Sequence, residues 1–158
     1  MTLQVRRVVT GHGADGGANV VIDEICRNVR SSRPGHQSCV VWTTDTSPAD
    51  NNGREDAAQR AIGTTLPGGT VFRIVRYEPG VTPRNHRTPS IDYAVVLEGE
   101  IDMELDTTTV RLRAGDVLVQ RGTIHNWVNR GVSPCTIAFV LVDAKPVEAG
   151  GTVLNAVS

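Results

Sequence analysis

The sequence has few of the residues on which several common kinds of site depend. Lys145 is the single lysine, so Schiff-base chemistry has almost nothing to draw on. Cys26, Cys39 and Cys135 are widely separated and form no C-X-X-C pair, which disfavours a disulfide framework or a zinc knot and predicts reduced, partly buried thiols. The chain lacks a G-X-S-X-G elbow, a P-loop and a G-X-G-X-X-G turn after a strand, which weighs against familiar hydrolase, nucleotide and dinucleotide chemistry.

Neither the net charge nor the length of the apolar stretches indicates a nucleic acid or membrane partner. Sixteen basic and 17 acidic side chains give a net charge of -1 with no block of one sign. No stretch approaches the roughly 20 apolar residues of a membrane helix, and no apolar run follows the first arginines as it would in a secretory signal. We expect a cytoplasmic protein that binds a small molecule.

A chain of 158 residues is predicted to form one structural domain. Most of its recognisable segments have the pattern of β-strands. Seven short β segments bounded by Gly, Pro or Asp follow one another from Gly69 onward, which favours an antiparallel sandwich or small barrel. Residues 69–145 are the predicted barrel, 1–68 add N-terminal strands and a loop, and 146–158 form a tail. Within 1–68, the loop 45–65 either shapes a pocket mouth or is inert surface, and it holds the only helix-like residues, Glu55–Ile62.

The N-terminal part of the chain is predicted to contain a hairpin and a loop. Gln4–Val9 and Val20–Ile22 are β-branched stretches on either side of a glycine-rich turn. The polar segment Arg27–His36 includes Pro34-Gly35 and indicates a surface loop. His12 and His36 are therefore expected to face solvent.

Alternation along the barrel strands predicts which side chains point inward. Ile101 and Met103 alternate with acidic residues and should face the core. By the same period of two, His125, Trp127 and Asn129 share one face of their strand, and we expect it to be the inward one.

Two spaced motifs place histidines and an acidic residue where they could close on a metal. The first is GVTPRNHRTPSIDYAVVLEG (80–99), with His86 and Asp92, and the second is GDVLVQRGTIHNWVN (115–129), with His125 and Asn129. Together they resemble the two motifs of the cupin family, over about half of the chain, from 69 to 144. The resemblance implies an all-β, antiparallel jelly-roll barrel with extra N-terminal strands and very little helix.

The resemblance also implies a metal site. The first family motif, G-(X)5-H-X-H-(X)3,4-E-(X)6-G, has two histidines and a glutamate; here His86 keeps the first histidine, Thr88 replaces the second and Asp92 replaces the glutamate. His86, Asp92 and His125 would hold a divalent ion, Fe, Mn, Ni or Zn. The alternative is a metal-free pocket in which Asp92 is hydrogen-bonded to a histidine.

Other residues are candidates for the pocket around these ligands. Thr88 is a poor ligand, because its hydroxyl keeps its proton, and a better hydrogen bonder beside the metal. Trp127 and Trp42 are candidate walls for an apolar or aromatic ligand, although core packing is the commoner role. Arg73 and Arg76 lie on opposite faces of one strand, so only one of them can meet a ligand.

The sequence is compatible with three functions. One is a metalloenzyme that acts on a small organic acid or an aromatic or carbonyl compound by oxygenation, decarboxylation, isomerisation or dehydration. The second is a binding or sensor module without chemistry, and the third is a metal-free catalyst in which histidine and Asp92 act as acid and base. The open sheet edges and the N-terminal strand also predict a homodimer.

Overall fold

The computed structural model describes residues 1 to 158. The chain is built almost entirely of strands, and its one helical element is a short 3-10 turn, η1 (Ala57–Gln59). The strands are β1 (Arg6–His12), β2 (Ala18–Ile25), β3 (Arg30–Arg33), β4 (His36–Thr44), β5 (Thr70–Tyr77), β6 (Ser90–Glu98), β7 (Glu100–Glu104), β8 (Thr109–Arg113), β9 (Val117–Arg121), β10 (Asn126–Val128), β11 (Cys135–Asp143), β12 (Val147–Ala149) and β13 (Thr152–Leu154).

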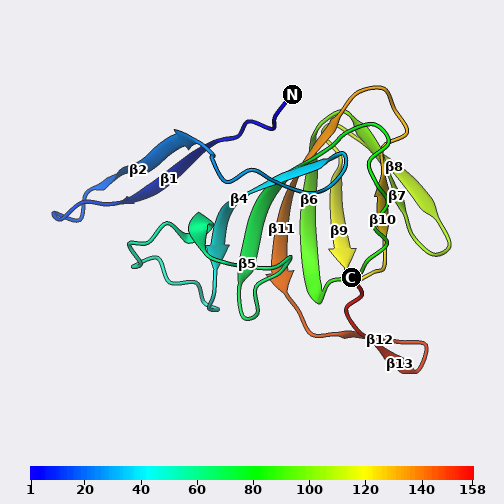
Figure 1. Cartoon of the computed structure of the whole chain (residues 1–158). Helices are drawn as coiled ribbons and strands as arrows, with labels where there is room; N and C mark the ends of the chain where they lie inside the picture. Colours follow the sequence, from blue (N-terminus) through cyan, green and yellow to red (C-terminus); the bar gives the residue numbers. More distant parts are fainter.

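Six strands form one antiparallel sheet in the order β3-β4-β5-β11-β6-β9 (Figure 1). Within it, Phe139 of β11 lies opposite Arg73 of β5 on one side and Ala94 of β6 on the other. Directly opposite residues in a sheet project to the same face. The register therefore gathers side chains from three strands that are distant in sequence.

A second sheet of three strands, in the order β10-β7-β8, completes the barrel. Ile101 and Met103 of β7 and Trp127 of β10 pack in one buried cluster with Val75 and Ile137 of the larger sheet. The two sheets thus enclose one hydrophobic core, which confirms the predicted all-β antiparallel barrel with very little helix.

The turn between β6 and β7 depends on Gly99. Its φ of 76° lies in the left-handed region, and a Cβ there would be 2.3 Å from the carbonyl oxygen of Pro134. Any side chain would collide with that backbone, so the turn that carries the chain from one sheet to the other requires glycine.

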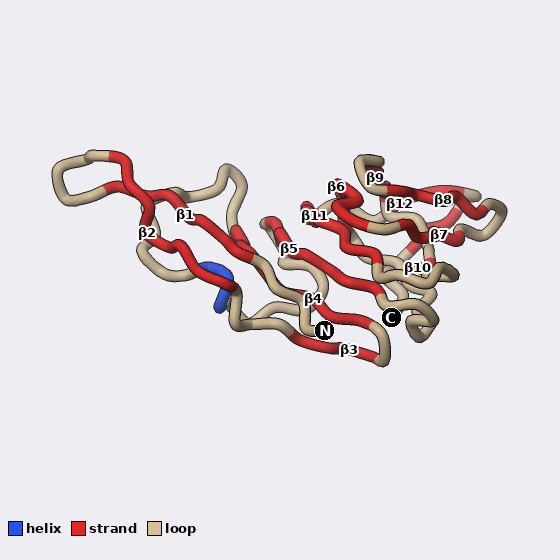
Figure 2. Tube along the Cα trace, turned by 90° about the horizontal axis from the view of Figure 1, so that it is seen from above, coloured by secondary structure: helices blue, strands red, loops and turns tan.

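The N-terminal hairpin β1-β2 projects from the barrel as an arm, away from the side that holds β7, β8 and β10 (Figure 2). At its base Leu3 and Cys26 pack on Cys39 and Ile74, on the outer face of the larger sheet. The predicted N-terminal strands and glycine turn are confirmed, and the three cysteines are free and buried as expected.

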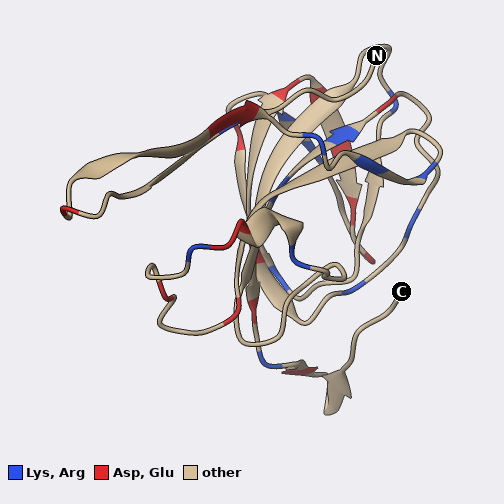
Figure 3. Ribbon diagram, turned by 60° about the vertical axis from the view of Figure 1, so that its left-hand side comes forward, with Lys and Arg blue, Asp and Glu red and all other residues tan.

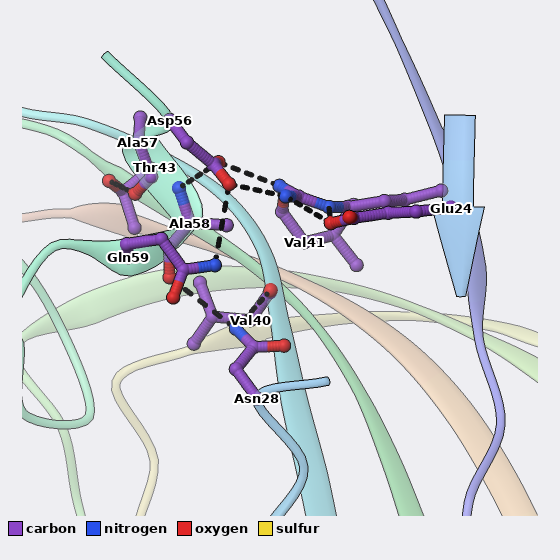
Figure 4. A network of polar contacts seen from close by, with 10 residues as sticks. Glu24, Asn28, Val40, Val41, Thr43, Asp56, Ala57, Ala58 and Gln59 are labelled. Carbon is purple, nitrogen blue, oxygen red and sulfur yellow. Dashed lines mark hydrogen bonds and ion pairs between the residues drawn. The ribbon is translucent and has the colours of Figure 1, made fainter. Parts of the chain in front are cut away.

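A buried arginine anchors the arm to the barrel. Arg7 is 4% exposed and forms ion pairs with Glu24 of β2 and Asp56, whose contacts are drawn in Figure 4. Asp56 also accepts a hydrogen bond from the backbone N–H of Ala58 at 3.1 Å and so caps η1. Of the helix-like residues Glu55–Ile62, only this single turn is helical, because Asp56 and Arg60 on either side of it are extended.

Segments outside residues 69–145 also contribute to the barrel. β4 belongs to residues 1–68 yet pairs along its length with β5, inside the larger sheet. At the other end of the chain, β12 and β13 form a hairpin below β9, and Val157 pairs with Arg87 through hydrogen bonds of 2.9 and 3.0 Å. Basic and acidic residues are interspersed along the ribbon (Figure 3). The structure contains no helix of the length and hydrophobicity that crossing a membrane takes.

Candidate functional site

A cavity of about 60 Å³ lies inside the barrel, on the inward face of β5, β6 and β11. Its wall combines basic, imidazole and aromatic side chains with a single carboxylate. The lining residues are Arg33, His36, Thr64, Arg73, Val75, Tyr77, Arg84, His86, Thr88, Asp92, His125, Trp127, Phe139 and Leu141. The cavity has room for a few atoms and concentrates most of the titratable groups of the barrel interior.

Two buried histidines are held together by their backbones. The N–H of His86 donates to the carbonyl of His125 and the N–H of His125 donates to that of His86, both at 3.0 Å. This bridge sets their ring centroids 4.2 Å apart. The two imidazoles therefore have a fixed relative position that does not depend on a bound ligand.

The ring nitrogens of the two histidines differ in their partners. Nδ1 of His86 lies 3.1 Å from the carbonyl oxygen of Arg84, and Nδ1 of His125 lies 3.0 Å from that of Thr123. With Nδ1 as the donor in both rings, Nε2 is the acceptor. The side-chain amide nitrogen of Gln120 contacts both ring nitrogens of His125, at 2.7 Å from Nδ1 and 3.2 Å from Nε2, whereas Nε2 of His86 has no hydrogen-bond partner in the protein.

Burial keeps both histidines neutral. It lowers the pKa of His86, and the cationic Arg84 acts in the same direction. For His125 burial lowers the pKa to about 4. Both rings therefore have an unprotonated nitrogen at neutral pH, and in His86 that nitrogen is free to accept a proton.

Asp92 ends a short chain of hydrogen bonds. The hydroxyl of Ser90 donates to Asp92 Oδ1 at 2.6 Å, and the Thr88 hydroxyl lies 2.8 Å from Ser90 Oγ, to which it donates. Burial raises the pKa of Asp92, while the bond from Ser90 and the charge of Arg73 oppose that shift. The carboxylate is thus held by the Ser90 hydroxyl at the start of β6, and no hydrogen bond joins it to either histidine.

Arg73 has an unused hydrogen-bond donor. Its Nη2 donates to the carbonyls of Gly63 and Thr64, at 3.2 and 2.7 Å, but its buried Nε has no partner. A buried donor without an acceptor costs about 1 to 3 kcal/mol, so an oxygen atom from a ligand would be stabilised there. Arg76 lies on the opposite face and pairs with Glu78 at 2.6 Å, so of the two arginines only Arg73 lines the cavity.

Comparison with known proteins identifies the family. The chain is 39% identical to the phomopsin biosynthesis cluster protein C' of Diaporthe leptostromiformis, over 96% of this chain and 85% of that protein. It is 34% identical to the cupin-domain-containing oxidoreductase fogC of Aspergillus ruber, over 94% of this chain and 77% of that protein. Residues 73–142 match the family described as Cupin domain. This chain is a cupin.

The fold comparison agrees with this identification. The cupin domain of Schizosaccharomyces pombe Cnp3 superposes with a TM-score of 0.54 at 12% identity, covering 87% of each chain. At this identity the likeness concerns the fold alone, and it supports the predicted jelly-roll arrangement. The matched range 73–142 begins in β5 and ends in β11, two of the strands that line the cavity.

The cupin motif residues lie around one cavity but do not form a metal-ligand set. No group of three His, Cys, Asp or Glu side chains in the structure is arranged to hold a metal ion. Asp92 is bound by Ser90, and Nε2 of His125 faces Gln120. Three arginines and one carboxylate line the same space, and this net positive charge opposes a divalent cation. The side chains in these positions do not fit a three-ligand centre.

Of the other candidate pocket residues, two line the cavity and two do not. Trp127 and Thr88 line the cavity as expected, and Trp127 is 3% exposed. Asn129 faces inward, but its amide donates to the carbonyls of Tyr77 and Ser133, which ties two chain segments together outside the cavity. Trp42 lies opposite Phe72 and is not part of the cavity wall.

Some cavity residues were not predicted from the sequence. His36 was expected in a solvent-facing loop, but it begins β4 and lines the cavity, and burial lowers its pKa to about 4. Pro34-Gly35 is the turn between β3 and β4 rather than the end of a long loop. Tyr77 could have been found, because it is four residues beyond Arg73 on the same strand and therefore on the same face.

Proposed function

We propose that this cupin is an enzyme that binds a small organic acid or carbonyl compound in the barrel cavity and moves a proton on it. The observation that carries the proposal is that one cavity is lined by Arg73, whose buried Nε has no hydrogen-bond partner, and by His86, whose Nε2 has none. An oxygen of the substrate would accept from Arg73, and a neighbouring carbon or oxygen would give its proton to His86.

The charges around the cavity favour a substrate with a negative or electron-rich oxygen. Arg33, Arg73 and Arg84 line it against the single carboxylate of Asp92. In a buried site such charges act through a lower effective dielectric than in water. Trp127 and Phe139 supply an apolar wall, so the preferred ligand has a small apolar part next to its carbonyl or carboxylate.

The supported step is proton removal beside a carbonyl group. The electron pair of the broken C–H bond moves to the carbonyl oxygen, which becomes an enolate stabilised by Arg73, and the proton goes to His86 Nε2. Return of that proton to another carbon gives an isomer. If the enolate instead expels an adjacent hydroxyl group, that group takes the proton from His86 and leaves as water, which gives a dehydrated product. Asp92, with its raised pKa, is placed to exchange a proton through Ser90 and Thr88.

The names of the relatives support a role in small-molecule biosynthesis. Relatives are described as proteins of the phomopsin and oryzines biosynthesis clusters or as cupin-domain-containing oxidoreductases. We infer that the substrate is an intermediate of comparable size and polarity.

Hydrogen exchange tests the proposal without knowledge of the natural substrate. A panel of small 2-oxo acids and aliphatic ketones is incubated in D₂O with the protein, and loss of the proton signal beside the carbonyl is followed by NMR. We expect catalysed exchange that His86→Gln removes and Arg76→Gln leaves unchanged. If a panel member binds but no member of the panel shows catalysed exchange, a non-catalytic binding module would be favoured.

Elemental analysis of the same protein tests the metal-dependent alternative. The 4.2 Å separation of the His86 and His125 rings is the observation in its favour. Iron, manganese, nickel or zinc bound stoichiometrically, and lost in both His86→Ala and His125→Ala, would overturn the acid-base proposal in favour of a metalloenzyme.

A further inference from the structure

A second and larger cavity, of about 630 Å³, lies at the end of the barrel below β6 and β9. Its volume is within the roughly 300 to 1,000 Å³ of typical small-molecule sites. The interior is mainly apolar and draws on both sheets and on the C-terminal hairpin. The apolar side chains that matter here are Met103, Leu105, Leu118, Val147 and Leu154.

The C-terminal hairpin forms one wall of this second cavity. Val147 of β12 and Leu154 of β13 lie opposite each other in the hairpin, and both side chains line the cavity. The hairpin is seated closely, since a Cβ on Gly122 would lie 2.8 Å from Val147 Cγ2. The chain then continues to Val157, which pairs with Arg87. The C-terminal segment thus closes one side of the cavity, which is not a property of the barrel alone.

The polar part of the second cavity has one sign of charge. Arg87, Arg121 and Lys145 line it, and no aspartate or glutamate does. The guanidinium of Arg87 donates only to backbone carbonyls, those of Gly122 and Asn155, at 3.1 and 3.3 Å. Lys145 is also the single lysine of the chain. Three cations without a carboxylate next to an apolar interior are complementary to a ligand with one anionic end.

One layer of side chains separates the two cavities. Thr88 lines both of them. Ser90 and Gln120 line the second cavity while they contact Asp92 and His125 of the first. A ligand in the second cavity would therefore lie against the hydrogen bonds that position the proposed catalytic groups without occupying their space.

We propose that this second cavity binds an amphiphilic carboxylate, a compound with one anionic group and an aliphatic tail of several carbons. The tail would pack among Met103, Leu118 and Leu154, and the carboxylate would lie near Arg121 and Lys145. The site is distinct from the cavity of the proposed function, and its occupancy does not depend on catalysis there.

Titration calorimetry with decanoate, below its micelle concentration, tests the site. Decan-1-ol carries the same tail without charge, and acetate carries the charge without the tail. We expect decanoate to bind at least tenfold more tightly than either. Arg121→Gln and Lys145→Gln should each weaken decanoate binding several-fold, and Leu118→Trp, which places an indole where the tail would pack, should remove most of it. Arg27→Gln, at an exposed arginine outside both cavities, is the matched control.

The outcomes separate this site from the first cavity. Decanoate should bind His86→Gln and Arg73→Gln as it binds the wild type, whatever the exchange experiment shows. Binding that is lost in those two variants but kept in folded Leu118→Trp would place the ligand in the first cavity and overturn the proposal. Equal affinity for decanoate and decan-1-ol would also overturn it. Thermal unfolding of each variant shows that the fold is retained.

Discussion

His86 and His125 exchange two backbone hydrogen bonds of 3.0 Å, yet only His86 has a ring nitrogen without a protein partner. The bridge fixes both imidazoles at the cavity, while Gln120 and Thr123 occupy the nitrogens of His125. The two residues that the cupin motifs bring together therefore differ in role: His86 is placed to take a proton, and His125 supports it.

Substitution of the two histidines should separate these roles. We expect His86→Gln to lower the catalysed exchange rate by roughly 100-fold or more, the usual contribution of a general base. Gln120→Leu removes the donor to His125 but leaves His86 in place, and a smaller loss is expected. NMR exchange rates under saturating ligand give the comparison. Equal losses in both variants would contradict a special role for His86.

Arg73 should control affinity for the oxygen of the ligand. Hydrogen bonds to charged groups contribute about 1.5 to 3 kcal/mol, so Arg73→Gln should weaken binding of a 2-oxo acid by roughly 10- to 100-fold. Arg76→Gln, on the outer face of the same strand, is the matched control and should bind normally. Fluorescence of Trp127, which lines the cavity, reports the titration. Unchanged affinity in Arg73→Gln would show that the free Nε does not meet the ligand.

Acid should destabilise the protein through its buried histidines. In the folded chain the pKa of His125 is lowered from 6.5 to about 4, so between these values the unfolded chain binds more protons. The free energy of unfolding should therefore fall as pH decreases from 6.5 toward 4, by up to about 3 kcal/mol for this group. Urea unfolding at pH 7 and pH 5 measures the effect. The difference should be smaller in His125→Gln, and an unchanged difference would count against the assignment.

Arg7 should matter more for stability than its neighbour Arg6. Arg7 is buried and pairs with Glu24 and Asp56, so Arg7→Met leaves a partly buried carboxylate without its partner. The loss should be about 2 kcal/mol, below the 3 to 5 kcal/mol of fully buried pairs because both carboxylates are partly exposed. Arg6 pairs with Asp23 on the surface, and Arg6→Gln should have little effect. Chemical denaturation of both variants checks the order.

Strand alternation accounts for what the sequence could predict about the site. Asp92 points inward and Tyr93 outward, and Arg73 and Arg76 separate in the same way, because successive side chains alternate across a regular strand. Alternation fails where the strand is irregular. A bulge between Val40 and Trp42 inserts an extra residue in β4, so Val40 faces Arg73 but Trp42 faces Phe72 on the other side of the sheet.

Other features of the site depend on contacts that no local pattern contains. His36 reaches the cavity because β4 joins the larger sheet beside β5, a pairing between segments far apart in the sequence. The two motifs predicted that His86, Asp92 and His125 meet. They did not predict that Ser90 takes the carboxylate and Gln120 the second imidazole, since that depends on side-chain positions within a few tenths of an ångström.

The predicted homodimer can be tested on two exposed apolar surfaces. Val8 and Val21 are about half exposed on the arm, and Tyr93, Val95 and Val119 are exposed on the outer face of β6 and β9. Large apolar patches on a soluble protein usually mark contact sites. Sedimentation analysis should give twice the chain mass, and Val95→Lys combined with Val119→Lys should give the monomer. Val132→Lys, at an isolated and fully accessible loop valine, is the control and should stay dimeric. A monomeric wild-type protein would contradict the prediction.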